Sequence, residues 1–322
     1  MKAIVHNTYG SPDVLELQEM DMPDPTDDEV LVRVRAASVN PVDWYSLTGT
    51  PYVGRMQMGL RKPKDNSVRI DFAGTLEAVG RDVTEFRPGD EVFGRSGAFA
   101  EYVCVPADEA LALKPANLTF EQAAAVPLAA LTALQGLRDT GQLQPGGKVL
   151  INGASGGVGT FAVQIAKALG AEVTGVCSTR NVDLVRSLGA DHVIDYTQED
   201  FTRSDRRYDL MLDLAGSRSW SACRRVLNPQ ATLVIVGAPK GNRLLGPLSH
   251  MVRVRLAALR SSQKAVFFIA KINKEDMVVL RELLEAGKVT PVIDRRYELS
   301  DIADALRYLG EGHAQGKIVL TV

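Results

Sequence analysis

Hydrophobic and polar residues alternate in the first third of the chain, which is the two-residue period of half-buried strands. Val30, Val32 and Val34 show the alternation most clearly. Arg87–Asp90 is a turn sequence that precedes an apolar run. Further strand-like segments are Phe72–Val79, Glu91–Gly94 and Phe99–Val105. We therefore expect residues 1–121 to form a mostly β domain.

From about residue 122, short apolar runs alternate at similar intervals with longer helical patterns. The runs are Val149–Asn152, Glu172–Cys177, His192–Asp195, Leu210–Leu214, Leu233–Val236 and Ala265–Ile269. Gly170 and Gly189 end two of the helical patterns, as glycine favours the left-handed conformation that follows a helix. The alternation of strand and helix predicts a doubly wound parallel sheet over residues 122–265.

The last part of the chain, residues 266–322, offers two helical patterns and one strand. The helices are expected around Lys274–Ala286 and after Ser300, and the strand over Lys317–Val322. We expect this tail to fold back onto the N-terminal part. The fold class is then α/β, with the parallel-sheet domain inserted within the β domain.

A glycine-dense turn follows the first apolar run and leads directly into a helical pattern. Ala154, Gly156 and Gly159 stand at the spacing of a dinucleotide-binding turn, with alanine in the first place. Such a turn lets backbone N–H groups and a helix N-terminus approach a pyrophosphate. The predicted cofactor-binding residues here are Ala154, Ser155, Gly156, Gly157, Val158 and Gly159.

The end of the second strand indicates which nicotinamide cofactor is bound. NAD-binding domains carry a carboxylate there, which holds the ribose 2′-hydroxyl. This chain instead has Ser178, Thr179 and Arg180. A guanidinium with hydroxyl support favours a 2′-phosphate, so we predict NADPH. The alternative is that Arg180 is a solvated loop cation.

Composition narrows the class of protein. The chain has 322 residues, of which 45% are apolar and 24% charged, with a net charge of −2. That balance argues against nucleic acid as the main partner. No apolar run reaches the length of a membrane span, and Met1–Val5 has a strand pattern and not that of a signal peptide. Cys104, Cys177 and Cys223 form no close pair, so we expect a cytoplasmic protein.

Five segments occur in the order of a known family. They are Ala37–Asp43, Asp71–Gly80, Pro88–Gly94, Pro127–Ala133 and Gly153–Gly159. Over its whole length the chain resembles the medium-chain dehydrogenase/reductase superfamily, and within it the zinc-independent quinone oxidoreductases of the zeta-crystallin and reticulon-interacting-protein branches. The resemblance implies a GroES-like β domain, an inserted Rossmann domain, an active site in the cleft between them, and a homodimer.

Zinc alcohol dehydrogenases share this fold, so the metal positions need comparison. The resemblance places their ligands at Asn40, at Ile70 and near Leu128, where only Asp71 offers a suitable side chain. One carboxylate cannot hold a tetrahedral Zn²⁺. The cysteine-rich structural zinc lobe is absent, and the histidines are scattered singly at His6, His192, His250 and His313. We expect a metal-free protein.

Without zinc to stabilise an alkoxide, the easier substrates are those that already accept hydride. These are quinones and α,β-unsaturated carbonyl compounds, reduced by hydride from NADPH. Two other functions stay open: an alcohol dehydrogenase-like reductase of simple aldehydes, and a non-catalytic NADPH-binding sensor or scaffold protein.

The resemblance places Asn40, Asp43, Tyr45 and Tyr52 so that they face the nicotinamide. The Asn40 amide would hold a substrate oxygen or a water, or is a cap residue before a proline. Asp43 would organise this polar group or cap a helix. Each tyrosine would donate to the developing oxyanion or stack on a flat substrate, unless it only packs.

Other residues are assigned to the cofactor by the resemblance. They are Thr132, Tyr196, Val236, Gly237, Phe267 and Phe268, with Ala238 in the same turn as Gly237. Tyr196 is alternatively a plain strand end. Lys317 would approach the cofactor, but a surface lysine is the favoured interpretation.

Two segments depart from simple quinone reductases. Tyr52–Lys64 is longer and more basic, and we interpret it as a substrate-selecting lid or a solvated loop. Lys240–Lys264 is basic and amphipathic. It is expected to be a surface helix or a subunit contact, with membrane contact the less favoured interpretation.

Overall fold

The computed structural model describes residues 1–64, 70–97, 99–237, 248–258 and 261–322. By the contacts within it, the chain divides into two compact units. Unit 1 comprises Met1–Leu131, Ile272–Gly287 and Pro291–Val322. Unit 2 comprises Thr132–Lys271 and Lys288–Thr290.

Unit 1 is built on a sheet of seven strands. Its strands are β3 (Glu29–Val39), β4 (Ile70–Val79), β5 (Glu91–Ser96), β6 (Tyr102–Pro106), β7 (Leu111–Leu113), β14 (Ile293–Glu298) and β15 (Lys317–Thr321). The order is β14-β15-β3-β4-β5-β7, and β6 pairs with β3. A separate two-stranded sheet pairs β1 (Lys2–Val5) with β2 (Glu16–Glu19).

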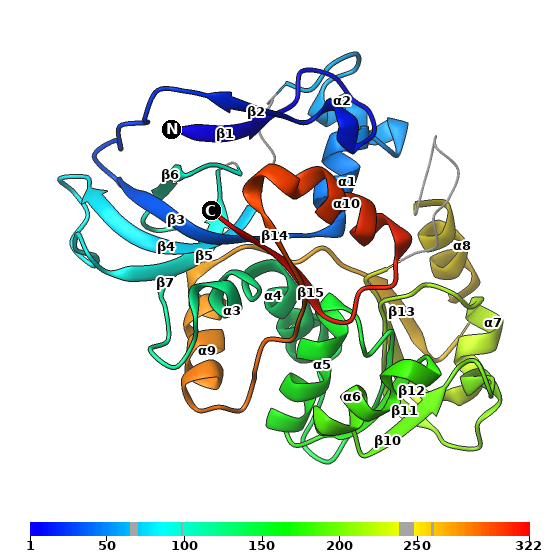
Figure 1. Cartoon of the computed structure of the whole chain (residues 1–322). Coiled ribbons are helices and arrows are strands. Elements are labelled where there is room, and N and C mark those ends of the chain that lie inside the picture. Colours follow the sequence, from blue (N-terminus) through cyan, green and yellow to red (C-terminus); the bar gives the residue numbers. More distant parts are fainter. Residues whose placement is uncertain (65–69, 98, 238–247, 259–260) are drawn as a thin grey trace. The chain divides into compact units, whose positions relative to one another are not determined.

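Short helices accompany this sheet. They are α1 (Pro41–Thr48), α2 (Arg55–Met58), α3 (Phe120–Ala124), α9 (Lys274–Glu285) and α10 (Ile302–Glu311), with 3₁₀ turns at Pro12–Val14, Tyr52–Gly54 and Leu299–Asp301. The terminal strand β15 pairs antiparallel with β3 and parallel with β14, and Figure 1 shows it in red beside β14. The expected return of the tail to the N-terminal part is thus confirmed.

Unit 2 contains six parallel strands. They are β8 (Lys148–Asn152), β9 (Glu172–Cys177), β10 (His192–Asp195), β11 (Tyr208–Asp213), β12 (Leu227–Ile235) and β13 (Lys264–Phe267). The order is β10-β9-β8-β11-β12-β13. Successive strands are added on one side of β8 up to β10, and on its other side from β11 onward. This is the strand order of a Rossmann fold, so the predicted fold class is confirmed.

The helices of unit 2 lie between these strands in the sequence. They are α5 (Gly157–Ala168), α6 (Val182–Ser187), α7 (Trp220–Cys223) and α8 (Leu248–Ala258), with 3₁₀ turns at Thr179–Asn181, Phe201–Arg203 and Arg224–Val226 and a π turn at Gly136–Thr140. Gly170 and Gly189 take the positive φ angles of +82° and +99° that a helix end favours. None of the helices in the described ranges is long and apolar enough to cross a bilayer.

The two boundaries that correspond to those expected after residues 121 and 265 both lie later in the sequence. One boundary lies within α4 (Pro127–Gln135), between Leu131 and Thr132, and another follows Lys271. Helix α3 lies against β3 and β4 of unit 1, which is why the first boundary moves past it. Each unit has a core of its own, around Phe72 and Leu320 in unit 1 and around Leu150 and Met211 in unit 2.

Candidate functional site

The glycine turn of unit 2 joins the end of β8 to the start of α5. At Gly159 a Cβ atom would lie 2.1 Å from the carbonyl oxygen of Gly153, so glycine is needed for the turn to pack on its helix. At Gly156 the nearest atom to such a Cβ, the same oxygen, is 3.6 Å away. The part of the chain that the structure describes therefore leaves room over Gly156, at the N-cap of α5. That room lies where a phosphate on the helix N-terminus would lie.

The residues beside the turn connect it to the end of β9. The backbone N–H groups of Gly153 and Ala154 both donate to the Val176 carbonyl. Asn181 Nδ2 donates to Ser155 Oγ at 2.8 Å, and Asn181 Oδ1 is buried without a hydrogen-bond partner among the described residues. A buried acceptor left open beside a nucleotide-binding turn is suited to a ligand hydroxyl. Sequence analysis missed Asn181, because only the fold brings it to the turn.

The end of β9 is followed directly by Ser178, Thr179 and Arg180. This strand end is where the sequence predicts selection between NADPH and NADH. Thr179 Oγ1 donates to Asp195 Oδ2 at 2.5 Å and lies 2.9 Å from Thr197 Oγ1. Because the Thr179 hydroxyl donates its single hydrogen bond to Asp195, it is less available to a phosphate than expected. Ser178 and Arg180 are the other two residues predicted for a 2′-phosphate.

Most other predicted cofactor residues lie where the parallel strands end. Tyr196 follows β10 and is 53% exposed. Val236 and Gly237 follow β12, and both of their N–H groups donate to the Asp213 carbonyl. The other predicted residues are Phe267 and Phe268, which end and follow β13 and are half-buried, Gly157 and Val158 in the first turn of α5, and Thr132, buried in α4. Ala238 lies outside the described residues. The carboxyl edge of such a sheet is where nucleotides bind.

Unit 1 contains a buried polar network centred on Asn40, the N-cap residue of α1. Asn40 Nδ2 donates to Asp71 Oδ2 at 2.9 Å, and its backbone N–H donates to Asp43 Oδ2 at 2.6 Å. Arg95 donates to Asp71 Oδ1 at 2.7 Å and lies 3.9 Å from Asp43 Oδ1. Lys317 Nζ donates to Asn40 Oδ1 at 2.6 Å. Lys317 is only 3% exposed, so the favoured interpretation as a surface lysine is wrong.

Sheet register assembles this network. Asp71 and Arg95 are cross-strand partners on β4 and β5, and Lys317 begins β15 beside β3. Burial raises the pKa of Asp43 to about 7, against the opposing effects of Arg95 and the Asn40 N–H. Burial lowers the pKa of Lys317, and the carboxylates of Asp71 and Asp43 oppose that shift. The network therefore combines two cations with two carboxylates away from water.

The two candidate tyrosines differ in their surroundings. Tyr45 lies in α1 and is half-buried, and burial raises the pKa of its phenol. Tyr52 is 39% exposed, and its ring lies 4.6 Å from the guanidinium carbon of Arg55. The same guanidinium lies 4.4 Å from the ring of Tyr9 and donates to the Gly49 carbonyl. Arg55 thus holds the start of the 52–64 segment against the rest of unit 1.

Two of the positions that the resemblance assigns to zinc ligands, Asn40 and Leu128, come together around Asp71. Asp71 Oδ2 accepts hydrogen bonds from the Asn40 amide and from the Leu128 N–H at 3.1 Å. However, the Lys317 ammonium already lies against Asn40 Oδ1 and 3.7 Å from Asp71 Oδ2, and Arg95 binds the other carboxylate oxygen. A metal ion would lie against two cations, so these residues do not fit Zn²⁺. Over the described ranges, no three His, Cys, Asp or Glu side chains are grouped so as to hold a metal.

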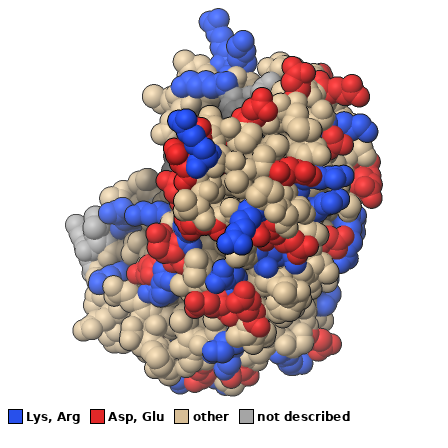
Figure 2. Space-filling model, turned by 90° about the vertical axis from the view of Figure 1, so that its left-hand side faces the viewer, with Lys and Arg blue, Asp and Glu red and all other residues tan. Residues whose placement is uncertain are grey.

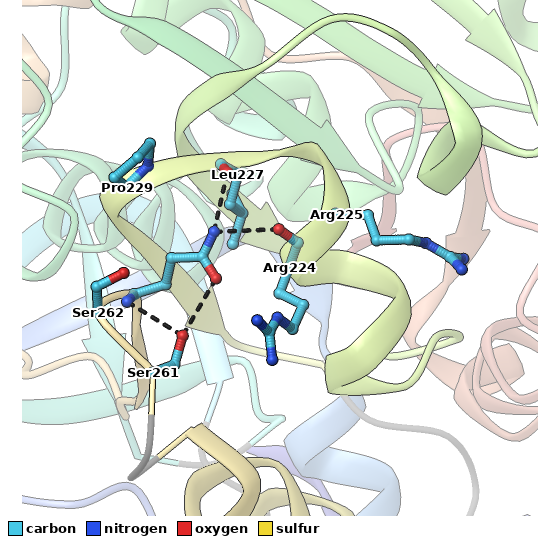
Figure 3. A pocket seen from close by; sticks show the side chains of 7 residues that line it. Arg224, Arg225, Leu227, Pro229, Ser261 and Ser262 are labelled. Carbon is cyan, nitrogen blue, oxygen red and sulfur yellow. Dashed lines mark hydrogen bonds between the residues drawn. The ribbon is translucent and has the colours of Figure 1, made fainter.

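Unit 2 has a hollow outside the predicted cofactor residues. This hollow of about 490 Å³ is lined by Arg224, Arg225, Leu227, Pro229 and Ser261–Gln263. Figure 3 shows these side chains. These residues precede or begin β12 and β13, so the hollow is at the edge of the sheet opposite to the glycine turn. Figure 2 shows acidic and basic side chains interspersed over one face, in keeping with the net charge of −2. Of the basic segment 240–264, residues 240–247 and 259–260 lie outside the described residues.

Comparison with known proteins gives the same fold for the whole chain. A family described as "Alcohol dehydrogenase GroES-like domain" matches residues 26–115, and one described as "Zinc-binding dehydrogenase" matches residues 188–320. The quinone oxidoreductase of Coxiella burnetii superposes with a TM-score of 0.85 at 31% identity, covering 100% of this chain and 99% of that one. Escherichia coli quinone oxidoreductase complexed with NADPH gives 0.83 at 25% identity, covering both chains fully.

Curated relatives are similar over almost all of the chain. The 2-methylene-furan-3-one reductase of Solanum lycopersicum is 34% identical, covering 99% of this chain and 79% of the relative. The mitochondrial NAD(P)H oxidoreductase RTN4IP1 of Homo sapiens is 36% identical, covering 100% and 89%. A GroES-like domain with a Rossmann domain inserted in it defines the class of medium-chain dehydrogenases/reductases. The chain belongs to this superfamily, and its resemblance to the quinone oxidoreductase branch is confirmed.

Proposed function

We propose that this chain is an NADPH-dependent reductase that transfers hydride to quinones or α,β-unsaturated carbonyl compounds. The observation that carries the proposal is the room over Gly156 at the N-cap of α5, which none of the described residues fills. Relatives support it by name, as they include an NADPH-dependent alkenal/one oxidoreductase of Arabidopsis thaliana, 33% identical, and a quinone oxidoreductase of Triphysaria versicolor, 32% identical.

The residues present fit NADPH. The N–H groups at the start of α5 would bind the pyrophosphate, and the open Asn181 Oδ1 would accept from a hydroxyl of the adenosine half. Arg180, with Ser178, would bind the 2′-phosphate. Bound NADPH would supply the hydride.

Unit 1 would supply the hydrogen-bond donor that the reaction needs. When hydride adds to an enone or a quinone, negative charge develops on the carbonyl oxygen. Asn40 Oδ1 is already occupied by Lys317, so the group that the amide offers to a substrate is N–H. A fixed N–H donor in a buried site stabilises a developing oxyanion. The half-buried phenol of Tyr45 is a second candidate donor.

The test follows the oxidation of NADPH, with NADH in parallel, against a benzoquinone, a naphthoquinone, an alkyl enone, an enal and a saturated aldehyde. We expect turnover of the quinones or enones, with NADPH preferred. Asn40→Ala should lower kcat by about 100-fold, the usual cost of one oxyanion donor. Asn117→Ala, which removes a different amide of unit 1, should not. A silent panel with NADPH still bound would favour the sensor or scaffold alternative.

Two further properties remain part of the proposal. We propose a homodimer, which light scattering on the purified protein tests directly. We also propose a cytoplasmic location, which fractionation of the source cells tests. Turnover of the saturated aldehyde alone, together with tightly bound zinc, would favour the alcohol dehydrogenase-like alternative.

A further inference from the structure

Lys317 is a buried cation to which the proposed hydride transfer assigns no role. It begins β15, is 3% exposed, and comes from the opposite end of the chain to its partners. Its Nζ donates to Asn40 Oδ1 at 2.6 Å and to the Val39 carbonyl at 3.2 Å. Because a buried ammonium loses its hydration, such a group is retained only where its contacts compensate.

The contacts of Lys317 decide which way the Asn40 amide points. The ammonium has only donors, so the amide atom against it must be the oxygen. Asp71 Oδ2 accepts, so the amide atom 2.9 Å from it must be the nitrogen. A flipped amide would place NH₂ against an ammonium and an oxygen against a carboxylate. The flipped state is therefore excluded on both sides, and the second N–H of Nδ2 has no partner among the described residues.

The charges of the network hold the ammonium in place. Asp71 Oδ2 lies 3.7 Å from Lys317 Nζ, while Asp71 Oδ1 is bound by Arg95 at 2.7 Å. Arg95 in turn lies 3.9 Å from Asp43, whose carboxylate caps the helix that follows Asn40. Each charged member thus faces a partner of opposite sign, and Lys317 and Asp71 both hydrogen-bond to the neutral Asn40 amide.

We propose that Lys317 is a positioning residue, whose ammonium fixes the Asn40 amide so that it presents an N–H donor to the substrate oxygen. The inference rests on the proposed function, since it assigns Lys317 a part in that reaction. Lys317 itself touches neither substrate nor cofactor in this assignment. Its contribution passes entirely through Asn40.

The test is a double-mutant cycle on the full-length protein with an accepted quinone or enone. Lys317→Met keeps most of the apolar stem and removes the cation, and we expect kcat to fall about 10- to 100-fold with the KM for NADPH unchanged. In an Asn40→Ala background the same substitution should change kcat less than about twofold, because the amide it positions is gone. Losses that multiply in the double variant would overturn the proposal.

Lys114→Met is the matched control for simple loss of a buried lysine. The Lys114 side chain is 5% exposed and its Nζ lies 3.0 Å from Glu91, in the same unit. We expect this variant to lose thermal stability yet keep kcat within about twofold. A kcat loss equal to that of Lys317→Met would reduce Lys317 to a structural role and overturn the proposal.

If Lys317→Met does not fold, Lys317→Gln replaces it in the cycle, because it keeps a polar side chain but removes the cation and can both donate and accept. The same criterion applies. A loss of kcat with an unchanged KM for NADPH, absent in the Asn40→Ala background, supports the proposal. Equal losses of kcat in both backgrounds overturn it. Failure of the proposed function is seen separately, as a wild-type protein that reduces no acceptor. If the wild-type protein is active and Asn40→Ala is equally active, Asn40 has no part in the reaction. Lys317 could then not act through Asn40, and the proposal would be overturned.

Discussion

At the scale of single residues, two glycines of one turn serve different purposes. Gly159 is required by the protein, since a Cβ atom there would meet the Gly153 oxygen at 2.1 Å. Gly156 has an ordinary φ of −81° and room around it, so the folded chain alone does not require it. We therefore expect that a side chain at Gly156 would affect cofactor binding and not folding.

This difference gives a prediction that separates folding from cofactor binding. Gly156→Ala should change the free energy of unfolding by no more than about 1 kcal/mol, the range of N-cap substitutions, yet weaken NADPH binding at least about tenfold, because its methyl group takes the phosphate's room. Gly159→Ala should destabilise the protein by about 2 kcal/mol or more. Urea unfolding and a fluorescence titration with NADPH measure both. Unchanged NADPH affinity in Gly156→Ala would contradict the placement of the pyrophosphate.

Arg180 carries the cofactor preference in the proposed site. Arg180→Ala should lower kcat/KM for NADPH about 10- to 100-fold and leave the value for NADH nearly unchanged, because only NADPH has a 2′-phosphate for the guanidinium. Arg186→Ala, which removes an exposed cation of α6 paired with Asp183, is the control and should alter neither value. Equal losses with both cofactors would show that Arg180 does not select the phosphate.

At the scale of elements, the terminal strand β15 decides the integrity of unit 1. It lies between β14 and β3, and its Leu320 is fully buried in the core of that unit. The strand also carries Lys317 to Asn40. Stability and the proposed donor site therefore depend on the same element.

Shortening a side chain of β15 should be costly. Leu320→Ala should lower the free energy of unfolding by about 3 kcal/mol, through lost burial and the cavity left behind. Leu60→Ala should have almost no effect, since Leu60 is 71% exposed in the segment that follows α2. Urea unfolding followed by circular dichroism measures both variants. A similar small effect for the two would mean that β15 does not pack as described.

At the scale of the whole molecule, charged side chains lie beside the positions that the resemblance assigns to zinc ligands. Two of these positions meet in unit 1, but the cations that lie there are those of Lys317 and Arg95. Metal analysis of the purified protein should find zinc well below one equivalent, and chelation should leave quinone or enone reduction unchanged. Stoichiometric zinc lost together with activity on chelation would contradict this arrangement.

Local sequence pattern was enough to predict the features that depend on neighbouring residues. Glu172–Cys177 and His192–Asp195 are strands as predicted, and the turn before α5 was found by its glycine spacing. Period and turn chemistry act over a few residues, so such elements follow from local pattern. The insertion of one domain in the other was also predicted, because the pattern changes near residue 122 and the tail returns to strand.

The tertiary structure alone decided which distant side chains meet. Lys317 and Asn40 are 277 positions apart, and Asp71 meets Arg95 only through the register of β4 and β5. Asn181 and Asp195 likewise reach the predicted cofactor residues through the parallel sheet of unit 2. No local signal marks these contacts, because strand pairing and burial are set by packing across the sheet and not by the residues on either side. The prediction that Lys317 is a surface residue is wrong for that reason. A lysine at the start of a strand is expected to be exposed unless its buried partners are known.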